Sequence, residues 1–454
     1  MLSRTTRGAA LAAALSATAC ATAGSTTFDA MRADDDRLVA RSQEARADDD
    51  RALASPTLER PAYVRAVLRR NPTIDSARQG WRAAVARVRQ TGAFEGPMLD
   101  VSVAPLSGPW SGARFGYGVG ISQRLPWFGK RDLETAVASA EAEAAKSDYE
   151  AMRRELALTA SLLFDQYFVA VRSLEVNVHH IELMRAMRAA AIAQVESGRG
   201  SLQDPLQAEA ELAHMEHDAV ILASQRDVVV AQMNELLHRD PELALPPPPK
   251  ELALAPEPDV RDTKKLVSDA IARRPEIAAA RLRARAEEQR GHRAGRDAYP
   301  DVTVSTSYNS MWDTPEHRWM VGLGLSLPIQ VERRAGMVDE ANAARSRYQS
   351  EAVRLEDAAR TQIIVALKQL EESKHVLHLF EERLLPIARS RIDAARASFV
   401  TSQNTFATVI DAEKALRSAE LAYQMARADC DRRRAELDRA LGLTPGLDGK
   451  GDPR

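Results

Sequence analysis

Paired histidines are the residues whose type and spacing come nearest to a chemical site. The pairs are His214 and His217, His375 and His378, and the adjacent His179 and His180. Two histidines three residues apart share one face of a helix and bind a transition metal only when further ligands join them. The sequence assigns no third ligand to either spaced pair, and adjacent histidines point to different sides of a helix. We therefore predict solvated helix faces here and no metal site.

Glycine-rich and nucleophilic motifs give no support for catalysis. Gly116, Gly118 and Gly120 superficially resemble a nucleotide loop, but they alternate with Tyr117 and Val119 as in a strand. The chain has no P-loop, nucleophile elbow or zinc-protease motif. We expect no catalytic residue, no cofactor and no metal ligand, so the chain is not predicted to be an enzyme. A formal net charge of −2 gives no reason to expect a nucleic-acid partner.

The amino terminus has the pattern of an export signal. Arg4 and Arg7 precede an apolar run that is shorter than the ~20 residues needed to span a bilayer. Ala17-Thr18-Ala19-Cys20 is similar to a bacterial lipobox, with Ala where Leu is usual. This pattern predicts a signal peptide over 1–19 and a lipidated Cys20. The alternative is ordinary cleavage after Ala19 or Ala23, which leaves Cys20 unmodified or removes it.

A repeated sequence organises the rest of the chain. Pro72 in Leu-Arg-Arg-Asn-Pro matches Pro275 in Ile-Ala-Arg-Arg-Pro, and equivalent matches join Pro126 to Pro328 and Glu209 to Glu413, 202 to 204 residues apart. Three matches in the same order indicate a duplicated unit. The predicted segments are a polar, flexible tether over 20–60, a first repeat over 61–240, a proline-rich linker over 241–261, a second repeat over 262–443 and a tail over 444–454.

Each repeat is predicted to contain a helix, two strands, a very long helix, a turn and a returning helix. The expected strands are about 98–104 and 114–125, then 301–310 and 317–327; the expected long helices are about 130–197 and 203–240, then 332–400 and 405–441. Because 130–197 contains no Gly or Pro, it forms ~100 Å of uninterrupted helix. Helices of this length suit a coiled-coil rod or a barrel of helices.

The strands alternate apolar with small or polar residues, as half-buried sheets and outer-membrane strands both do. Four of the five tryptophans, Trp110, Trp127, Trp312 and Trp319, lie in or beside these strands. Tryptophan gathers at membrane interfaces, which favours the membrane interpretation. Four strands cannot close a barrel, because the smallest has 8, so two or three copies must share one.

The duplicated order and the turn sequences resemble the TolC-like outer membrane efflux proteins (outer membrane factors) from about residue 60 to 443. The resemblance implies a mainly α-helical chain with a small β part, in a homotrimer whose 12-strand outer-membrane β-barrel continues as a periplasmic α-helical barrel. It further implies a passive exit duct, surrounded by outer-membrane lipid, for substrates delivered by an inner-membrane pump of the RND type and a periplasmic adaptor.

Two segments carry this resemblance in detail. Ser122–Arg131 is similar to the corresponding segment of the heavy-metal, CzcC-like branch, which implies metal cations as cargo. The helix-to-helix turns imply a periplasmic entrance and adaptor contact at Gly198, Gly200, Ser201, Asp204, Thr405 and Asp411. The glycines permit a tight reversal, and Ser201 or Thr405 caps the returning helix. Three copies of Asp411 would form a ring that favours cations; the alternative is that Asp411 only faces solvent.

Two alternatives to this function remain open. Within the same class, the duct serves drug efflux or type I secretion. In a different class, the chain is a lipid-anchored periplasmic coiled-coil scaffold without a pore. The scaffold explains the long helices, but it explains neither the alternating strands nor the tryptophans beside them.

We predict that radiolabelled palmitate enters the wild-type chain and not Cys20→Ser, because the lipobox supplies the acylated residue. Equal labelling of both chains, or none in either, would leave only a cleaved signal peptide. The Cys20→Ser chain should still fractionate with outer membranes, since the barrel does not depend on the anchor.

Overall fold

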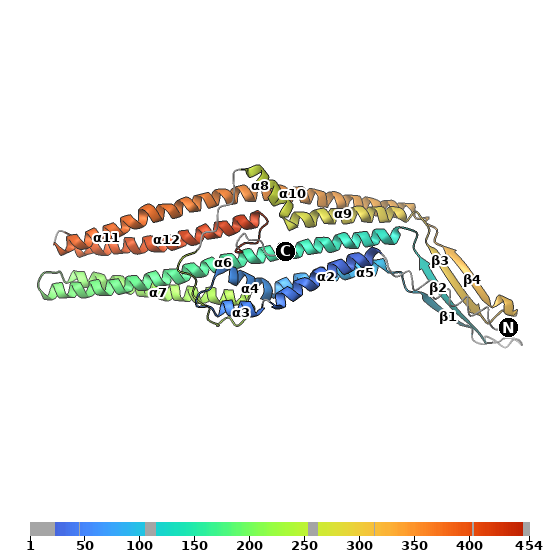
Figure 1. Cartoon of the computed structure of the whole chain (residues 1–454), viewed down its shortest axis with the longest axis horizontal. Helices are drawn as coiled ribbons and strands as arrows, with labels where there is room; N and C mark the ends of the chain where they lie inside the picture. The colour runs from blue at the N-terminus through green and yellow to red at the C-terminus, as the bar shows by residue number, and fades with distance from the viewer. Residues whose placement is uncertain are drawn as a thin grey trace. The chain divides into compact units, whose positions relative to one another are not determined.

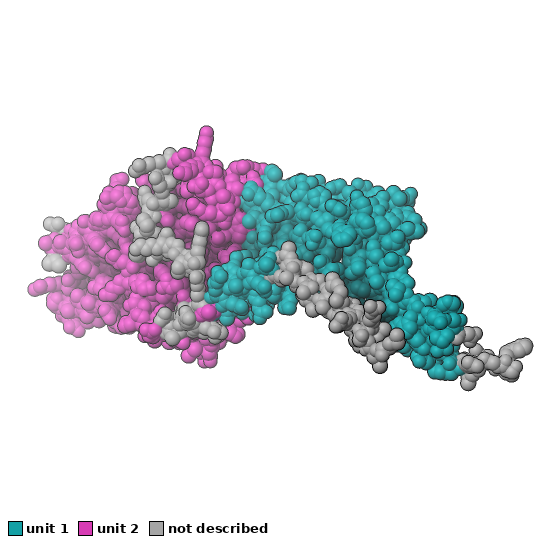
Figure 2. All heavy atoms as spheres, turned by 45° about the vertical axis from the view of Figure 1, so that its right-hand side comes forward, with its two compact units in different colours: residues 1–39, 78–149, 276–355 teal, residues 40–77, 150–275, 356–454 magenta. Residues whose placement is uncertain are grey.

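The computed structural model describes residues 23–44, 46–104, 115–252, 262–312, 314–401 and 404–447. These residues are mainly helical, with one four-stranded sheet (Figure 1). The chain divides into two compact units, coloured separately in Figure 2. Unit 1 comprises Met1–Val39, Arg78–Tyr149 and Glu276–Leu355, and unit 2 comprises Ala40–Ala77, Glu150–Pro275 and Glu356–Arg454. In the described residues no helix combines the length and apolarity needed to cross a membrane.

The same order of elements occurs twice. The first series is α4 (Arg60–Arg70), α5 (Pro72–Gly92), β1 (Met98–Ala104), β2 (Gly116–Leu125), α6 (Lys130–Glu196) and α7 (Gln203–Leu236). The second is α8 (Thr263–Arg273), α9 (Pro275–Arg296), β3 (Val302–Asn309), β4 (Trp319–Leu325), α10 (Val331–Leu379), α11 (Leu385–Val400) and α12 (Phe406–Ala440). The short 3₁₀ turn η2 (Pro315–His317) precedes β4. The predicted fold class, a duplicated and mainly helical chain, is confirmed.

The four strands of unit 1 form an antiparallel sheet in the order β1-β2-β3-β4. Val101 pairs with Val119, Val119 with Tyr308, and Tyr308 with Trp319, so these side chains share one face. That face is mostly apolar, and most of its side chains are exposed; Val321 is 81% and Leu323 77% exposed. The opposite face carries small and polar residues: Asp100, Ser102, Gly118, Gly120, Ser122, Thr303, Ser305, Ser307, Gly322 and Gly324.

At two positions, glycine on the second face leaves room for a serine hydroxyl on the neighbouring strand. A Cβ on Gly118 would lie 2.6 Å from the Ser102 hydroxyl oxygen, and one on Gly322 would lie 2.6 Å from that of Ser305. Both distances are shorter than any real van der Waals contact. Both glycines lie in the strands that the sequence predicts, and a larger residue at either position would displace the facing serine hydroxyl.

The segment expected to be a flexible tether over 20–60 is instead largely helical. It contains α2 (Ala23–Glu44) and α3 (Arg46–Leu53). Within unit 1, Phe28, Met31 and Leu38 of α2 pack against the buried cluster around Trp81. Asp35 is buried and bonded to Arg78 at 3.4 Å. The tether prediction was wrong here, because apolar residues at helical spacing lie among its charges and find a partner in the fold.

The second long helix, expected over 332–400, is interrupted once. The turn η3 (Phe380–Leu384) is π-helical, and the Leu385 N–H donates to the Phe380 carbonyl oxygen. Pro386 follows directly. Proline has no N–H to continue the α-helical ladder, and its ring crowds the preceding turn, so one extra residue is accommodated there. The sequence prediction overlooked this consequence of Pro386.

The proline-rich linker is held to unit 2 through its main chain. The Asn234 side-chain amide donates to the carbonyl oxygens of Pro241 and Leu243, at 3.1 and 2.7 Å. The Tyr167 hydroxyl donates to the Pro246 carbonyl oxygen at 3.0 Å, and Arg172 donates to that of Pro248 at 2.7 Å. The described part of the linker, residues 241–252, has neither helix nor strand, and side-chain donors satisfy several of its carbonyl groups.

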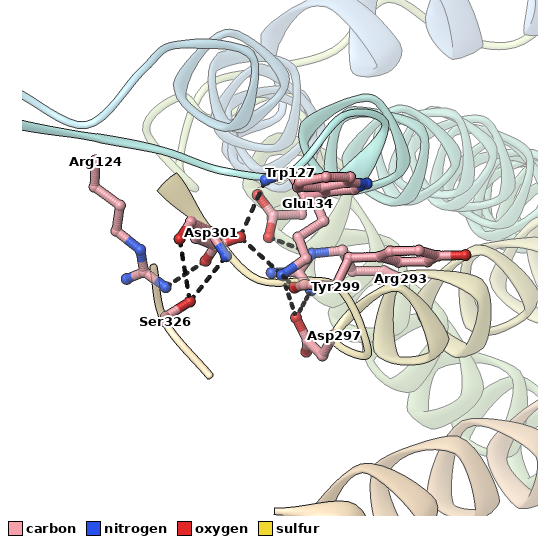
Figure 3. A network of polar contacts seen from close by, with 9 residues as sticks. Arg124, Trp127, Glu134, Arg293, Asp297, Tyr299, Asp301 and Ser326 are labelled. Carbon is pink, nitrogen blue, oxygen red and sulfur yellow. Dashed lines mark hydrogen bonds and ion pairs between the residues drawn. The ribbon is translucent and has the colours of Figure 1, made fainter. Parts of the chain in front are cut away.

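The corner between the sheet and the helices of unit 1 is built on Asp301, which directly precedes β3 (Figure 3). Its carboxylate accepts from Lys130 at 2.8 Å, from Arg124 at 2.7 Å and from the Trp127 N–H at 3.0 Å. Burial disfavours the charged carboxylate, but these bonds outweigh burial and lower the pKa of Asp301 to about 2. Its main chain exchanges bonds with Ser326 at the end of β4.

We expect Asp301→Ala to lower the free energy of unfolding by about 3–5 kcal/mol, because the buried Lys130 ammonium loses its main partner. Asp297→Ala is the matched control: Asp297 lies 3.3 Å from Lys130 but is one-third exposed, so its loss should cost about 1 kcal/mol or less. Urea denaturation at pH 7 measures both. The Asp301 contribution is present above pH 3.8 and is lost as the pH falls through about 2. Equal stability of the two variants would contradict this account.

Candidate functional site

The first helical hairpin reverses at two glycines between α6 and α7. Gly198 has a φ of +73°, a left-handed conformation that L residues with a Cβ rarely adopt. Gly200 is needed for a different reason, since a Cβ there would lie 3.1 Å from both the Gln194 Cβ and the Val195 nitrogen. The reversal expected at these two residues therefore depends on the left-handed backbone conformation of Gly198 and on the close approach of the chain to Gly200.

Ser201 and Asp204 close the amino-terminal end of α7. The Ser201 hydroxyl accepts from the Gln203 N–H at 3.2 Å, while the Asp204 carboxylate accepts from the Ser201 N–H at 3.3 Å. This reciprocal arrangement satisfies backbone donors that a helix start leaves unpaired. Asp204 is half-buried and is thus occupied by its own turn.

The second hairpin, between α11 and α12, is built differently. Thr405 occupies the N-cap position of α12, but its side chain makes no capping hydrogen bond. Its hydroxyl oxygen lies 3.1 Å from that of Thr408 instead. The aromatic rings of Phe399 and Phe406 close the turn, with centroids 5.4 Å apart. The N-cap residue of α7 is Leu202, so Ser201 bonds the first helical N–H from one residue earlier, and neither proposed residue makes a side-chain bond from the N-cap position.

Asp411 lies on the exposed side of α12, between two buried residues. Ile410 belongs to a cluster that also contains Met184 of α6 and Leu212 of α7. Ala412 belongs to a second cluster, which contains Ile392 of α11. Each neighbour of Asp411 is thus turned into a core, and Asp411 is left exposed. Its carboxylate is therefore available to a partner or to a pore.

A buried charged group lies farther along α12, where sequence reasoning expected nothing. His180 of α6 lies 2.6 Å from the Glu413 carboxylate through Nδ1 and 3.0 Å from that of Glu420 through Nε2. His180 and Glu413 are 1% and 0% exposed. Burial opposes the charged imidazole, but the two carboxylates outweigh burial and raise the pKa of His180 to about 9.

The signal that could have found this group is an acidic residue in an apolar seam. Val409, Glu413, Leu416 and Glu420 lie on one face of α12 at steps of three and four residues. Val409, Glu413 and Leu416 are buried. A carboxylate in such a seam requires a cationic partner. The sequence could not identify His180 as that partner, because the two residues are 233 apart.

The other histidines do not gather ligands. His214, His217, His375 and His378 are all exposed, and His378 lies 3.1 Å from Glu382. Across the described ranges, no group of three His, Cys, Asp or Glu side chains is placed to hold a metal ion. Cys20 lies outside the described residues. The two helical hairpins therefore remain the candidate site.

Comparison with known proteins identifies the class. Residues 63–237 and 266–443 match the family Outer membrane efflux protein, with one segment in each repeat. These segments make up most of the chain, so the chain belongs to this family. Its members are transport channels, which confirms the prediction that the chain is an outer-membrane efflux channel protein and not an enzyme.

Particular relatives refine the comparison. Over 145 residues the chain is 26% identical to the cobalt-zinc-cadmium resistance protein CzcC of Cupriavidus metallidurans, an alignment spanning 32% of this chain and 34% of that protein. The outer-membrane channel OprN has a similar fold, with a TM-score of 0.72 at 20% identity over 85% of this chain and 90% of that chain. The transmembrane channel CusC gives a TM-score of 0.72 at 16% identity over 85% and 92%.

Proposed function

We propose that three copies of the chain form one passive exit duct in the outer membrane. The observation that carries the proposal is the four-stranded sheet, which exposes an apolar face while β1 and β4 each pair along one edge only. In hydrocarbon, each unpaired backbone group costs several kcal/mol, so such a sheet must be closed by other copies. Three copies supply 12 strands, which leave an open lumen, whereas 8 strands are filled by side chains.

The two helical hairpins of each copy form the periplasmic entrance in this proposal. The free face of α12 supports this role, because Asp411 is exposed while its neighbours are buried. Three Asp411 carboxylates around a narrow opening attract cations and repel anions. A periplasmic adaptor docks on the turns around Gly198, Gly200, Ser201 and Thr405, and an RND-type inner-membrane pump drives the cargo. Lipid on Cys20 adds an anchor to the barrel.

The cargo proposed for the duct is a transition-metal cation. The similarity to CzcC supports this proposal. The segment Ser122–Arg131 does not, because Arg124, Trp127 and Lys130 are engaged in the corner around Asp301. The similarity of this segment to the heavy-metal branch is explained by its structural role in the corner, and it therefore does not indicate the cargo. Drug efflux and protein secretion are the competing uses of the same duct.

A detergent-extracted trimer is the first expected result, because four strands cannot close alone. Native mass spectrometry of the full chain should give three times the monomer mass. A stable monomer in detergent would end the channel proposal and favour the coiled-coil scaffold without a pore.

Asp411→Asn should lower cation selectivity and weaken block by multivalent cations in planar bilayers, since the ring loses its negative charge. Measurements belong at ~0.01 M salt, where the Debye length is about 30 Å and screening does not hide the effect. Asp411→Glu is the matched control, because it keeps a carboxylate at the same position. If Asp411→Asn conducts like the wild type, Asp411 is a surface residue.

Deletion of the chain should sensitise cells to transition-metal ions, and the double substitution His214→Ala, His217→Ala should restore resistance as the wild type does. No further ligand joins the exposed histidine pair among the residues that the structure describes, so its loss should not affect transport. Sensitivity to dyes and antibiotics without any change for metals would overturn the metal cargo. Failure of the double variant at normal trimer levels would instead show that these histidines act.

A further inference from the structure

His180 lies between two carboxylates, and only a doubly protonated imidazole can donate a hydrogen bond to each of them. Each ring nitrogen faces a carboxylate of α12, Glu413 at 2.6 Å and Glu420 at 3.0 Å. An ionised carboxylate only accepts hydrogen bonds, so both ring nitrogens must donate. A neutral imidazole has one N–H, and its other nitrogen would then face a carboxylate with no proton between them. With both carboxylates ionised, this geometry requires a buried imidazolium, in agreement with the raised pKa of His180.

The surrounding charges come from all the helices that meet here in unit 2. From α11, Arg396 bonds Glu413 at 3.2 Å and Arg389 lies 3.5 Å from Glu420. Between α7 and α12, Lys414 pairs with the buried Glu211 at 2.7 Å and Arg417 with Asp218 at 3.1 Å. Arg417 also donates to the side-chain oxygen of Asn177 on α6 at 2.7 Å. On the same helix, the ring of the exposed His179 lies 5.8 Å from the ring of His180.

These bonds fix how α12 is rotated. Glu413 and Glu420 are seven residues apart, so they lie on one face two turns apart. At ~100° per residue, Asp411 lies about 200° from Glu413, on the opposite side of the helix. An imidazolium that holds Glu413 and Glu420 therefore constrains both the rotation and the height of α12 against α6, in addition to the packing of Ile410 and Ala412. The direction in which Asp411 points follows from this.

We propose that His180 is a positioning residue of the entrance: its imidazolium clamps two turns of α12 to α6 and so presents Asp411 on the opposite face. Removal of the ring proton releases one of the two carboxylates, and the hairpin end of α12 then loses its fixed rotation. The role of Asp411 rests on the proposed function, whereas the clamp itself does not.

The pH range follows from the raised pKa. An unperturbed histidine titrates near 6.5, and the pKa of His180 is about 9. A folded pKa above the unfolded value means that the stabilisation is complete below pH 6.5 and is lost as the pH rises through about 9. At neutral pH the clamp is closed.

The first arm of the test needs no pore. Melting temperatures of the detergent-extracted full chain are compared for wild type, His180→Gln and the exposed control His179→Gln from pH 6.5 to 10.5. His180→Gln should melt several degrees below wild type at pH 7, and the difference should close by pH 10. The control should match wild type throughout. A deficit of equal size at pH 7 and pH 10 would show a packing role only and overturn the clamp.

A second variant keeps the test decisive if His180→Gln fails to fold. Glu420 is only partly buried, and Glu420→Gln removes one of the two charges that hold the imidazole proton. The alkaline transition of the melting temperature should then move to lower pH. An unmoved transition would overturn the clamp.

The second arm measures cation selectivity in planar bilayers at low salt. Selectivity of the wild type should fall between pH 8 and 10, and His180→Gln should show at pH 7 the reduced selectivity of wild type at pH 10. A pH-independent wild-type selectivity would overturn the link from His180 to Asp411. If the wild type does not conduct at all, the proposed channel fails, and the melting profiles alone decide on the clamp.

Discussion

Backbone groups at an open sheet edge must be paired before a sheet can enter hydrocarbon, and the proposed channel depends on that requirement. The sheet has one apolar and one small or polar face, with β1 and β4 at its edges. In the proposed trimer, other copies complete this sheet. For the helices of several copies to meet as well, the helices that follow β2 and β4 would have to leave the sheet at a fixed angle.

That angle depends on one carboxylate. Asp301 begins β3, yet it bonds Lys130 and the Trp127 N–H where β2 leads into α6, and Ser326 where β4 leads into α10. Asp301 thus joins three connections between the strands and the helices: the one before β3, the one after β2 and the one after β4 (Figure 3). The indole of Trp127 stacks on Tyr299 with ring planes 7° apart, which covers the same junction. A tryptophan first noticed as a membrane-interface residue therefore also has a structural function.

The sequence predicted those parts of the fold that local patterns determine. Alternation of apolar residues with glycine identified β2 and β4, and the absence of Gly and Pro identified α6. The reversal at Gly198 and Gly200 could likewise be predicted from the sequence, because the backbone at each position favours glycine for a local reason. What the sequence missed depends on distant partners. Helix α2 needs the cluster around Trp81, and His180 needs Glu413 from the other repeat.

The helical part raises a problem that apolar packing alone does not solve. Many buried residues of α11 and α12 are alanine, among them Ala388, Ala395 and Ala412. Small, similar side chains fit one another at several rotations and heights, so they bury surface without specifying one arrangement. Buried charged pairs contribute little net stability, but a wrong pairing leaves a charge without a partner. His180 with Glu413 and Lys414 with Glu211 exclude the neighbouring arrangements for this reason. In such a seam, apolar residues hold the helices together and buried charges select their register.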